Sequence, residues 1–139
     1  MAVATSYIEF ATRGDSDIID ITANVSGAVS ESGLTDGVVT VFAPGATGAV
    51  TTIEYESGLV SDFKRMLERI APQDIEYAHN LRWGDGNGHS HVRASLIGPG
   101  LSVPLIGGKM PLGTWQQIIF IDMDNRPRER KLIVQIVGD

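Results

Sequence analysis

Short runs of β-favouring residues, bounded by glycine, proline, asparagine or aspartate, recur along this chain of 139 residues. Such runs predict strands, here over residues 3–12, 38–42, 50–55, 101–106, 114–123 and 131–137. The run 38–42 indicates a strand that is buried on both faces. The small residues that follow it predict a hairpin with the next strand. The turn at 124–127 predicts a closing hairpin between the last two strands.

Periodic apolar positions predict two helices. The first begins near Thr22 and ends at Gly33, because glycine favours the left-handed conformation just after a helix. The second covers 57–70, where an apolar stripe is typical of a helix that packs on a core, and Pro72 stops it. Residues 91–97 fit a short helix as well as a strand, and the periodicity leaves the choice open.

Strands outnumber helices and connect by hairpins, which predicts an α+β fold with a largely antiparallel sheet and two or three helices. The length is ample for one core and short for two, so we expect a single domain over 1–139.

Charge and composition limit the possible binding partners and the kinds of site in this protein. A net charge of −6 argues against nucleic acid, whose binding depends on clustered Lys and Arg. No apolar run approaches the ~20 residues that span a bilayer, and the N-terminus lacks the pattern of a signal peptide. The absence of cysteine excludes disulfides, thiolate metal sites and cysteine nucleophiles. We therefore expect a cytoplasmic protein with no nucleic-acid or membrane partner.

Candidate chemistry gathers between His79 and Gln116. This stretch holds all three histidines and both tryptophans, and eight of the sixteen glycines lie between Gly84 and Gly113. Glycine permits left-handed backbone and close approach at an entropic cost. Because so many glycines lie beside the histidines, we predict a pocket in this stretch. A long surface loop is the alternative.

The three histidines, His79, His89 and His91, allow two kinds of site. Three imidazoles hold Zn²⁺ if their side chains converge. On a strand His89 and His91 would share a face, whereas on a helix they would diverge by about 200°. A single histidine that acts as a general acid or base is the less demanding use. Exposure to solvent is the remaining alternative and fits His89 best.

Other polar residues suggest capture of an anionic ligand. Glu54, at the end of a strand, is either an exposed charge or a pocket acid. Phosphate-contacting residue types lie among the glycines and near the C-terminus, namely Asn87, Ser95, Thr114, Gln116 and Arg130. The phosphate motifs GxxxxGK[ST] and GxGxxG are absent, and no serine lies in the GxSxG of a nucleophilic triad.

The run His91-x-x-Ala-Ser-Leu-x-Gly, followed by Leu112-Gly-Thr-Trp-Gln116, resembles the signature of the YjbQ-like proteins. Further matching positions make the likeness span nearly the whole chain, among them Asp20-Ile-Thr22, Glu54, Asp62, His79-Asn80 and Asp85-x-Asn87.

The resemblance implies a homotrimer of compact α+β domains, with a pocket near the subunit boundaries. It also implies thiamine-phosphate synthase activity, which joins a pyrimidine pyrophosphate to a thiazole phosphate and releases pyrophosphate. Mg²⁺ is then a candidate cofactor, ahead of Zn²⁺. Carried over by position, the catalytic residues are Glu54, His79 and His91, and the ligand-binding residues are Asn87, Gln116 and Arg130, with Ser95 and Thr114 beside them.

Gly45 departs from the family pattern, because an imidazole is expected at this position. Loss of a catalytic imidazole typically costs orders of magnitude in rate. A non-catalytic trimer that binds a phosphorylated or heteroaromatic small molecule, with Trp115 as a stacking face, is therefore the alternative to the enzyme.

Two geometric expectations follow. Trp115 and Gln116 should point to opposite faces of their strand, with Gln116 toward the ligand and Trp115 packed. His79 and His91 should converge in one pocket with Glu54, brought together by the glycine-rich loop 84–88.

Overall fold

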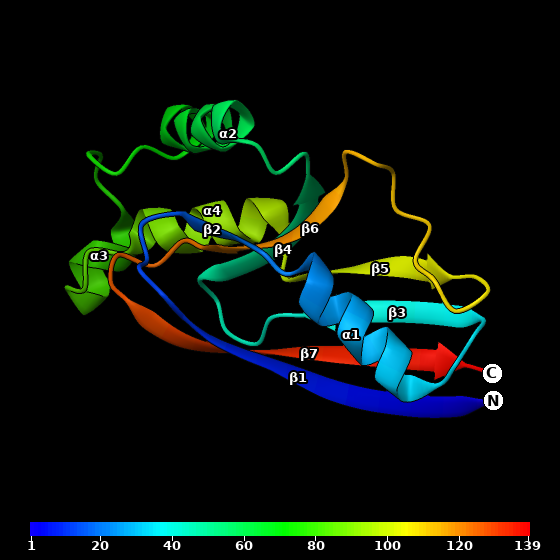
Figure 1. The fold of residues 1–139 in the computed structure, drawn as a ribbon. Coiled ribbons are helices and arrows are strands. Elements are labelled where there is room, and N and C mark those ends of the chain that lie inside the picture. The colour runs from blue at the N-terminus through cyan, green and yellow to red at the C-terminus, as the bar shows by residue number, and fades with distance from the viewer.

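The computed structural model describes residues 1–139, which form seven strands and four helices (Figure 1). In chain order these are β1 (Ala2–Thr12), β2 (Asp17–Asp20), α1 (Thr22–Ser32), β3 (Gly37–Phe42), β4 (Gly48–Ile53), α2 (Ser57–Ile70), α3 (Ala78–Trp83), α4 (Gly88–Ile97), β5 (Gly100–Leu105), β6 (Gln117–Asp122) and β7 (Arg128–Gly138).

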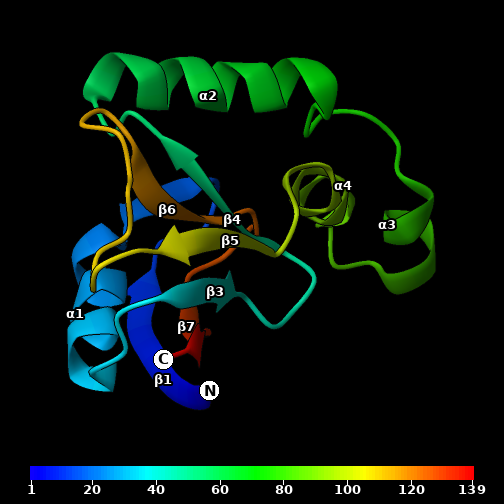
Figure 2. The same ribbon diagram turned by 90° about the vertical axis from the view of Figure 1, so that its right-hand side faces the viewer.

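The strands form two antiparallel sheets. The four-stranded sheet has the order β1-β7-β3-β5, and the three-stranded sheet has the order β2-β6-β4. Figure 2 shows α2 lying across the three-stranded sheet, with α4 seen end-on beside it and α1 at the opposite side of the molecule. The two chain ends lie together at one end of β1 and β7. This is the α+β class that the sequence predicts.

Strand β6 is the centre of the packing. Because adjacent strand residues point to opposite faces, Ile118 and Phe120 enter the core shared with the four-stranded sheet and α1. Ile119 and Ile121 enter a second core, where Leu67 of α2 anchors that helix. All five side chains are fully buried. A strand covered on both faces explains the continuous apolar run in the sequence.

Both predicted hairpins are wrong. Strand β3 pairs with β5 and β7, whereas β4 pairs with β6 in the other sheet. The turn between β3 and β4 therefore carries the chain from one sheet to the other, and the turn between β6 and β7 does the same. A turn sequence specifies a reversal of the chain, but the choice of partner strand depends on residues far away in the sequence.

The helices also differ from the sequence prediction. Residues 91–97 are helical, as part of α4, and the short helix α3 brings the total to four rather than two or three. The last-but-one strand begins at Gln117 and not at Thr114, because the N–H of Gln116 donates to the carbonyl of Gly113 at 3.1 Å and closes a turn.

The outer face of the four-stranded sheet has no cover within the chain. Val38 and Phe42 are 47% and 43% exposed, so the prediction that β3 is buried on both faces is wrong for the single chain. The exposed residues form rows across the strands. Two rows are apolar, and a polar row lies between them. The first apolar row is Val3, Val137, Val38 and Pro104, and the second is Tyr7, Ile133 and Phe42. The polar row between them is Thr5, Gln135, Thr40 and Ser102.

Candidate functional site

His79 and His91 meet where α3 packs against α4. Their ring centroids are 4.4 Å apart, with the ring planes tilted by 41°. The side chain of Asn80 ties the two helices together, because its Oδ1 accepts the N–H of Gly88 at 2.8 Å. The glycine-rich loop thus reverses the chain and places the two imidazoles side by side, as expected from the sequence.

Behind His79, two carboxylates and an amide continue the polar cluster. Nδ1 of His79 is sealed from solvent without a hydrogen bond, and Oδ1 of Asp85 is 3.5 Å away. The amide of Asn87 lies between Asp85 and Asp124. It donates to Asp124 at 3.4 Å, and a half-turn of the amide places its nitrogen 2.9 and 3.2 Å from the oxygens of Asp85. Asp85 is thus positioned to balance a positive charge on His79.

His89 does not join this cluster. It is two residues from His91 on α4, a spacing that points the two side chains in nearly opposite directions. The helix therefore removes the three-histidine zinc alternative, which required His89 and His91 on one face of a strand. His89 is also 2% exposed, so the alternative of a solvent-exposed His89 does not apply either. No group of three or more histidine, aspartate or glutamate side chains is arranged to hold a metal ion.

A cavity of about 190 Å³ opens beside His91. The turn between β3 and β4 forms one wall with Gly45, Ala46 and Gly48, and α4 forms the other with His91 and Ser95. The hydroxyl of Ser95 donates to the carbonyl of His91 at 2.8 Å, which leaves its oxygen lone pairs open.

The turn that lines this cavity carries unused donors. The backbone N–H groups of Gly45, Ala46 and Thr47 donate to no acceptor in the chain. Successive free N–H groups in a turn form a concave site for anions. A β-carbon on Gly45 would lie 3.5 Å from Nη1 of Arg130, so this guanidinium nitrogen also faces the turn.

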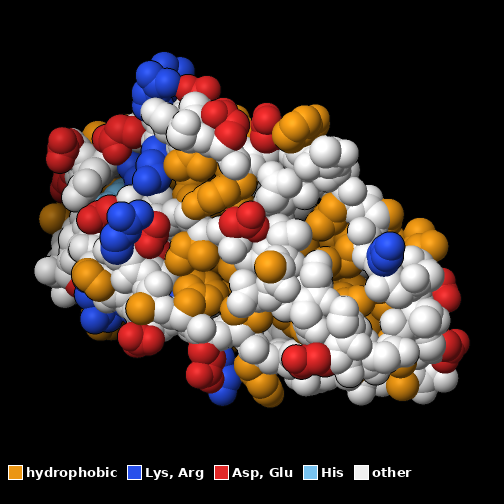
Figure 3. All heavy atoms as spheres, in the orientation of Figure 1, with side chains coloured by type: hydrophobic (Ala, Val, Ile, Leu, Met, Phe, Trp, Pro, Cys, Tyr) orange, Lys and Arg blue, Asp and Glu red, His pale blue; other side chains and the backbone are white.

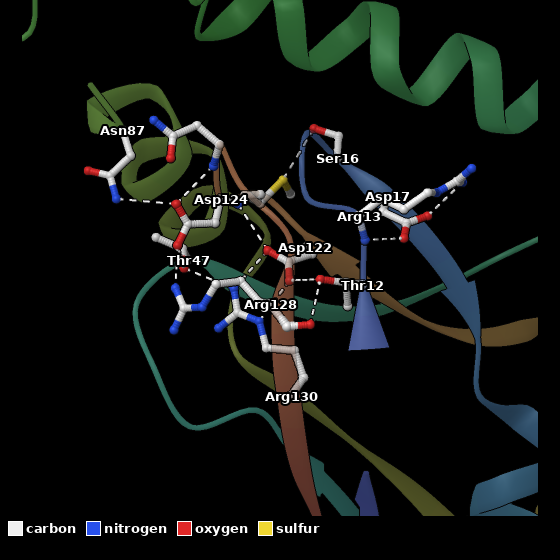
Figure 4. Close-up of polar contacts among 12 residues, drawn as sticks. Thr12, Arg13, Ser16, Asp17, Thr47, Asn87, Asp122, Asp124, Arg128 and Arg130 are labelled. Carbon is white, nitrogen blue, oxygen red and sulfur yellow. Dashed lines mark hydrogen bonds and ion pairs between the residues drawn. The ribbon is translucent and has the colours of Figure 1, made fainter. Parts of the chain in front are cut away.

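A buried ion pair holds Arg130 in place. Asp122 is fully buried and accepts from Nε and Nη2 of Arg130 at 2.8 and 2.7 Å, in a two-pronged pair. The hydroxyl of Thr12 donates to the same carboxylate at 2.5 Å. Figure 4 shows both side chains converging on Asp122. Nη1 makes none of these bonds, and it is the atom of Arg130 that lies nearest to Gly45.

Thr47 fixes the turn to this pair. Its hydroxyl accepts from Nη2 of Arg130 at 3.0 Å and donates to Asp124 at 3.2 Å, and its carbonyl accepts the N–H of Met123 at 2.8 Å. Arg128 also pairs with Asp124 (Figure 4). The free N–H groups are therefore carried on a braced turn.

The carboxyl of Asp124 is held ionised by its neighbours. Burial raises its pKa, but the N–H of Asn125, the amide of Asn87 and the guanidinium of Arg128 outweigh burial and leave the pKa below its ordinary value. Asp124 thus remains an anion that braces Thr47 and Arg128 at neutral pH.

Asp122, Asp124 and Thr47 were not recognised from the sequence. One signal was available, because Asp122-x-Asp124 directly follows the apolar run of β6, and Arg128-x-Arg130 follows within the next eight residues. Residues two apart on an extended chain share a face, so two carboxylates facing two guanidinium groups were foreseeable.

The remaining predicted residues lie at the far end of the three-stranded sheet. Glu54 follows the end of β4, six residues beyond Gly48, which is about 20 Å at roughly 3.3 Å per residue. Its side chain is exposed, and the predicted convergence with His79 and His91 does not occur within the chain. Strand β4 leads away from the cavity and carries Glu54 with it.

Gln116 also lies at this far end. It lines a separate cavity of about 270 Å³ between β4 and β5, and its Nε2 donates to the hydroxyl of Thr52 at 3.3 Å. Thr114 is exposed, and Trp115 is 72% exposed, so Trp115 does not pack within the single chain. Residues 114–116 form a turn, so the strand alternation on which that prediction rested does not apply.

Relatives of this chain have the same fold over its whole length. The family described as "UPF0047 protein YjbQ-like" matches residues 6–139. A UPF0047 protein of Methanothermobacter thermautotrophicus is 42% identical over 138 residues, which cover 99% of this chain and 94% of the relative. The chain belongs to the YjbQ-like family. The resemblance read from the motif between His91 and Gln116 is therefore confirmed.

Solved YjbQ-like structures agree. A YbjQ-like protein of unknown function from Sulfolobus solfataricus has a TM-score of 0.90 at 28% identity, covering 99% of this chain and all of that one. A yjbq/UPF0047-family protein from Clostridium acetobutylicum has a TM-score of 0.83 at 36% identity, covering 94% and 99%. No helix of this YjbQ-like chain has the length and apolar character of a membrane span.

Gly45, the position at which the sequence resemblance implies an imidazole, adopts a φ of +110°. This backbone conformation is strained for any residue with a β-carbon. The space around it is sufficient, since the nearest atom to an added β-carbon is 3.5 Å away. The backbone conformation, and not a lack of space, therefore favours glycine over a residue with a side chain at position 45.

Acidification is expected to destabilise the chain through His89. Burial lowers the pKa of His89, and Arg93 lowers it further, against the carboxylates of Glu68, Asp15 and Asp124. Between the lowered pKa and the ordinary value of about 6.5, the unfolded chain binds more protons than the folded chain, so stability falls as the pH falls through this window.

Melting temperatures measured from pH 7.5 to pH 5 test this expectation. The His89→Asn variant should show a shallower fall below pH 6.5 than the parent. Parallel curves for the two proteins would contradict a role of His89 in the pH dependence.

Proposed function

We propose that the cavity between Gly45 and His91 binds the phosphate or pyrophosphate group of a small ligand. The observation that carries the proposal is the gathering of unused polar groups at the turn before β4, beside one cavity. Gly45, Ala46 and His91 line the cavity, and Nη1 of Arg130 lies against Gly45. The N–H groups of residues 45–47 and Nη1 are donors without a partner in the chain, and the groups come from three separate elements.

The physical chemistry favours an anion with several oxygens. Backbone N–H groups and a guanidinium group form short, charge-assisted hydrogen bonds to phosphate oxygens. A guanidinium group is charged at physiological pH, and the pairing of Arg130 with Asp122 through Nε and Nη2 leaves Nη1 unoccupied. Protonated His91 would add a further donor. The carboxylate of Asp85 would balance the positive charge of the histidine pair, because it lies next to His79, whose ring contacts that of His91.

Replacement of His91 by alanine is expected to weaken the binding of inorganic pyrophosphate about tenfold or more, because one charge-assisted hydrogen bond is lost. Folding should be nearly unchanged, since His91 is only half-buried and makes no hydrogen bond through its ring. Isothermal titration calorimetry measures the affinity. Val92→Ala, an exposed position on the same helix, is the matched control. Equal affinity in His91→Ala and the parent would refute the site.

The reaction that fits this site is transfer of thiamine-phosphate synthase type. There the bond between the methylene carbon attached to the pyrimidine ring and a pyrophosphate oxygen breaks, and the thiazole nitrogen forms the new bond to the same methylene carbon. Charge develops on the leaving pyrophosphate, which the donors of residues 45–47 and Arg130 would stabilise. Should Mg²⁺ accompany the pyrophosphate, Asp85 is the half-exposed carboxylate that could hold it, since Asp122 and Asp124 are engaged by arginines.

Gly45 favours a second candidate, a non-catalytic protein that holds the same kind of ligand. The assay that separates the two incubates the chain with both thiamine precursors and measures pyrophosphate release, beside Gly45→His. Release above the uncatalysed rate supports the transferase. Retained pyrophosphate binding without release in either protein supports the binding protein.

We further propose that the chain assembles as a homotrimer through the outer face of the four-stranded sheet. The two apolar rows on this face are unsuited to permanent exposure on a monomer. Assembly would also account for the division of the candidate residues between two ends of the chain, because Glu54 and Gln116 of one protomer would lie near the cavity of another.

The Phe42→Glu variant is expected to lower the mass in light scattering from three chains toward one, because a buried unpaired carboxylate in each subunit contact opposes assembly. Ile70→Glu, which replaces an exposed apolar residue on α2, is the control and should leave the mass unchanged. A parent protein with the mass of one chain at micromolar concentration would refute the assembly.

A further inference from the structure

A third cavity lies on the opposite side of α4 from His91. Its volume is about 300 Å³, and every residue that lines it is polar. Its walls are the loop before β2, the C-terminal half of α2 with the residues just after it, and the first two turns of α4. Figure 3 shows charged side chains of both signs gathered at this end of the molecule, below α2.

The floor of this cavity is a fixed polar framework. The side chain of Arg93 is buried, at 7% exposure. It donates to the carbonyl of Ala71 at 2.9 Å, to the hydroxyl of Ser16 at 3.3 Å and to the carboxylate of Glu68 at 2.6 Å. These bonds use three of the five guanidinium N–H groups. Arg93 thus joins α2, α4 and the loop before β2, and it retains donors for a ligand.

His89 supplies an unused polar group to the same cavity. The residue is 2% exposed, its Nδ1 is sealed from solvent without a partner, and the chain gives no hydrogen bond to either ring nitrogen. A buried N–H without a partner is rarer than a buried acceptor without one. The proton of the neutral ring therefore belongs on Nε2, which makes this nitrogen a donor that can face the cavity.

The rim adds one free charge of each sign. Lys64 and Asp15 are exposed and have no hydrogen bond or ion pair through their side chains, whereas Glu68 is already paired with Arg93. The lining as a whole carries two cations and two carboxylates. The free ammonium group of Lys64 and the free carboxylate of Asp15 offer a partner to each sign of charge, so the cavity suits a ligand that bears both charges.

We propose that this cavity binds the zwitterionic head group of an α-amino acid. The carboxylate of the ligand accepts from Nε2 of His89, from Arg93 and from Lys64, and its ammonium group pairs with Asp15. The N–H groups of Asp15 and Ser16 donate to the carbonyls of Asp124 and Asp122 at 2.6 and 2.7 Å. The loop that carries Asp15 is thereby fixed to the end of β6, which separates this cavity from the one beside Gly45.

Titration of the full chain with the common α-amino acids, one at a time, tests the proposal. The ring signals of the three histidines, followed by NMR, report where each ligand binds. We expect at least one amino acid to shift the His89 signal and leave His91 unmoved. Its methyl ester, which lacks the negative charge, and its deaminated acid, which lacks the positive one, should each bind at least about tenfold more weakly.

Matched variants separate the site from general charge effects. Asp15→Asn keeps a residue type that tolerates the φ of +51° at this position, and Lys64→Met keeps the length of the side chain. Both should weaken binding, whereas Asp74→Asn and Arg69→Met, which lie outside the cavity, should not. Three outcomes would overturn the proposal: no amino acid shifts His89, the deaminated acid binds as tightly as its parent, or the shift appears at His91 instead.

Discussion

Replacement of Asp122 by alanine is expected to lower the free energy of unfolding by about 3–5 kcal/mol, the typical cost of breaking a buried ion pair by removing one partner. Asp122 is fully buried and Arg130 is 7% exposed. Without the carboxylate, the guanidinium of Arg130 stays buried with an unbalanced charge, and the hydroxyl of Thr12 loses its acceptor. Chemical denaturation followed by tryptophan fluorescence measures the change.

The exposed pair of Asp62 and Arg65 is the control. Its side chains are 62% and 66% exposed, and Asp62→Ala should cost less than about 1 kcal/mol. Asp122→Asn should fall between the two, because the amide retains an acceptor but removes the charge. A loss below about 1 kcal/mol in Asp122→Ala would contradict the buried pair as a stabilising element.

The sequence specifies the elements of this fold better than their partners. The amphipathic pattern of α2 and the β-favouring run of β1 depend on residues close together in the chain, and both elements were located within one or two residues. Pairing of β4 with β6 and of β3 with β7 is decided by packing between two sheets. Local turn residues carry no information on that choice, so the two nearest-neighbour hairpins were the wrong inference.

The candidate site was predictable to a similar extent. The approach of His79 to His91 follows from a glycine-rich reversal between them, which is a local feature. Divergence of His89 from His91 depended on whether the segment was helical, and the short apolar period could not decide between helix and strand. The distance of Glu54 from the cavity reflects the straight course of β4, which no residue near Glu54 encodes.

Phe120 couples the core to the cavity beside Gly45. Its ring is fully buried and packs edge-on against Phe10, with 5.4 Å between ring centroids. Gly48 lies directly on the ring, since a β-carbon there would be 2.7 Å from it. The guanidinium of Arg130 lies 5.6 Å from the ring centroid, within the range of a cation–π contact. The ring thus supports both the braced turn and the arginine.

Phe120→Ala is therefore expected to lower the free energy of unfolding by about 3–5 kcal/mol, the usual cost of truncating a buried phenylalanine. It should also weaken pyrophosphate binding, because Gly48 and Arg130 lose their support and the donors around the cavity no longer hold their positions. Thermal denaturation and calorimetric titration, both well below the melting temperature of the variant, measure the two effects. Phe10→Ala removes the other ring of the pair without touching the turn, so it should reduce stability and leave pyrophosphate affinity intact. If Phe120→Ala lost stability but bound pyrophosphate as tightly as the parent, the bonds from Thr47 and Asp122 alone would suffice to position the turn and Arg130.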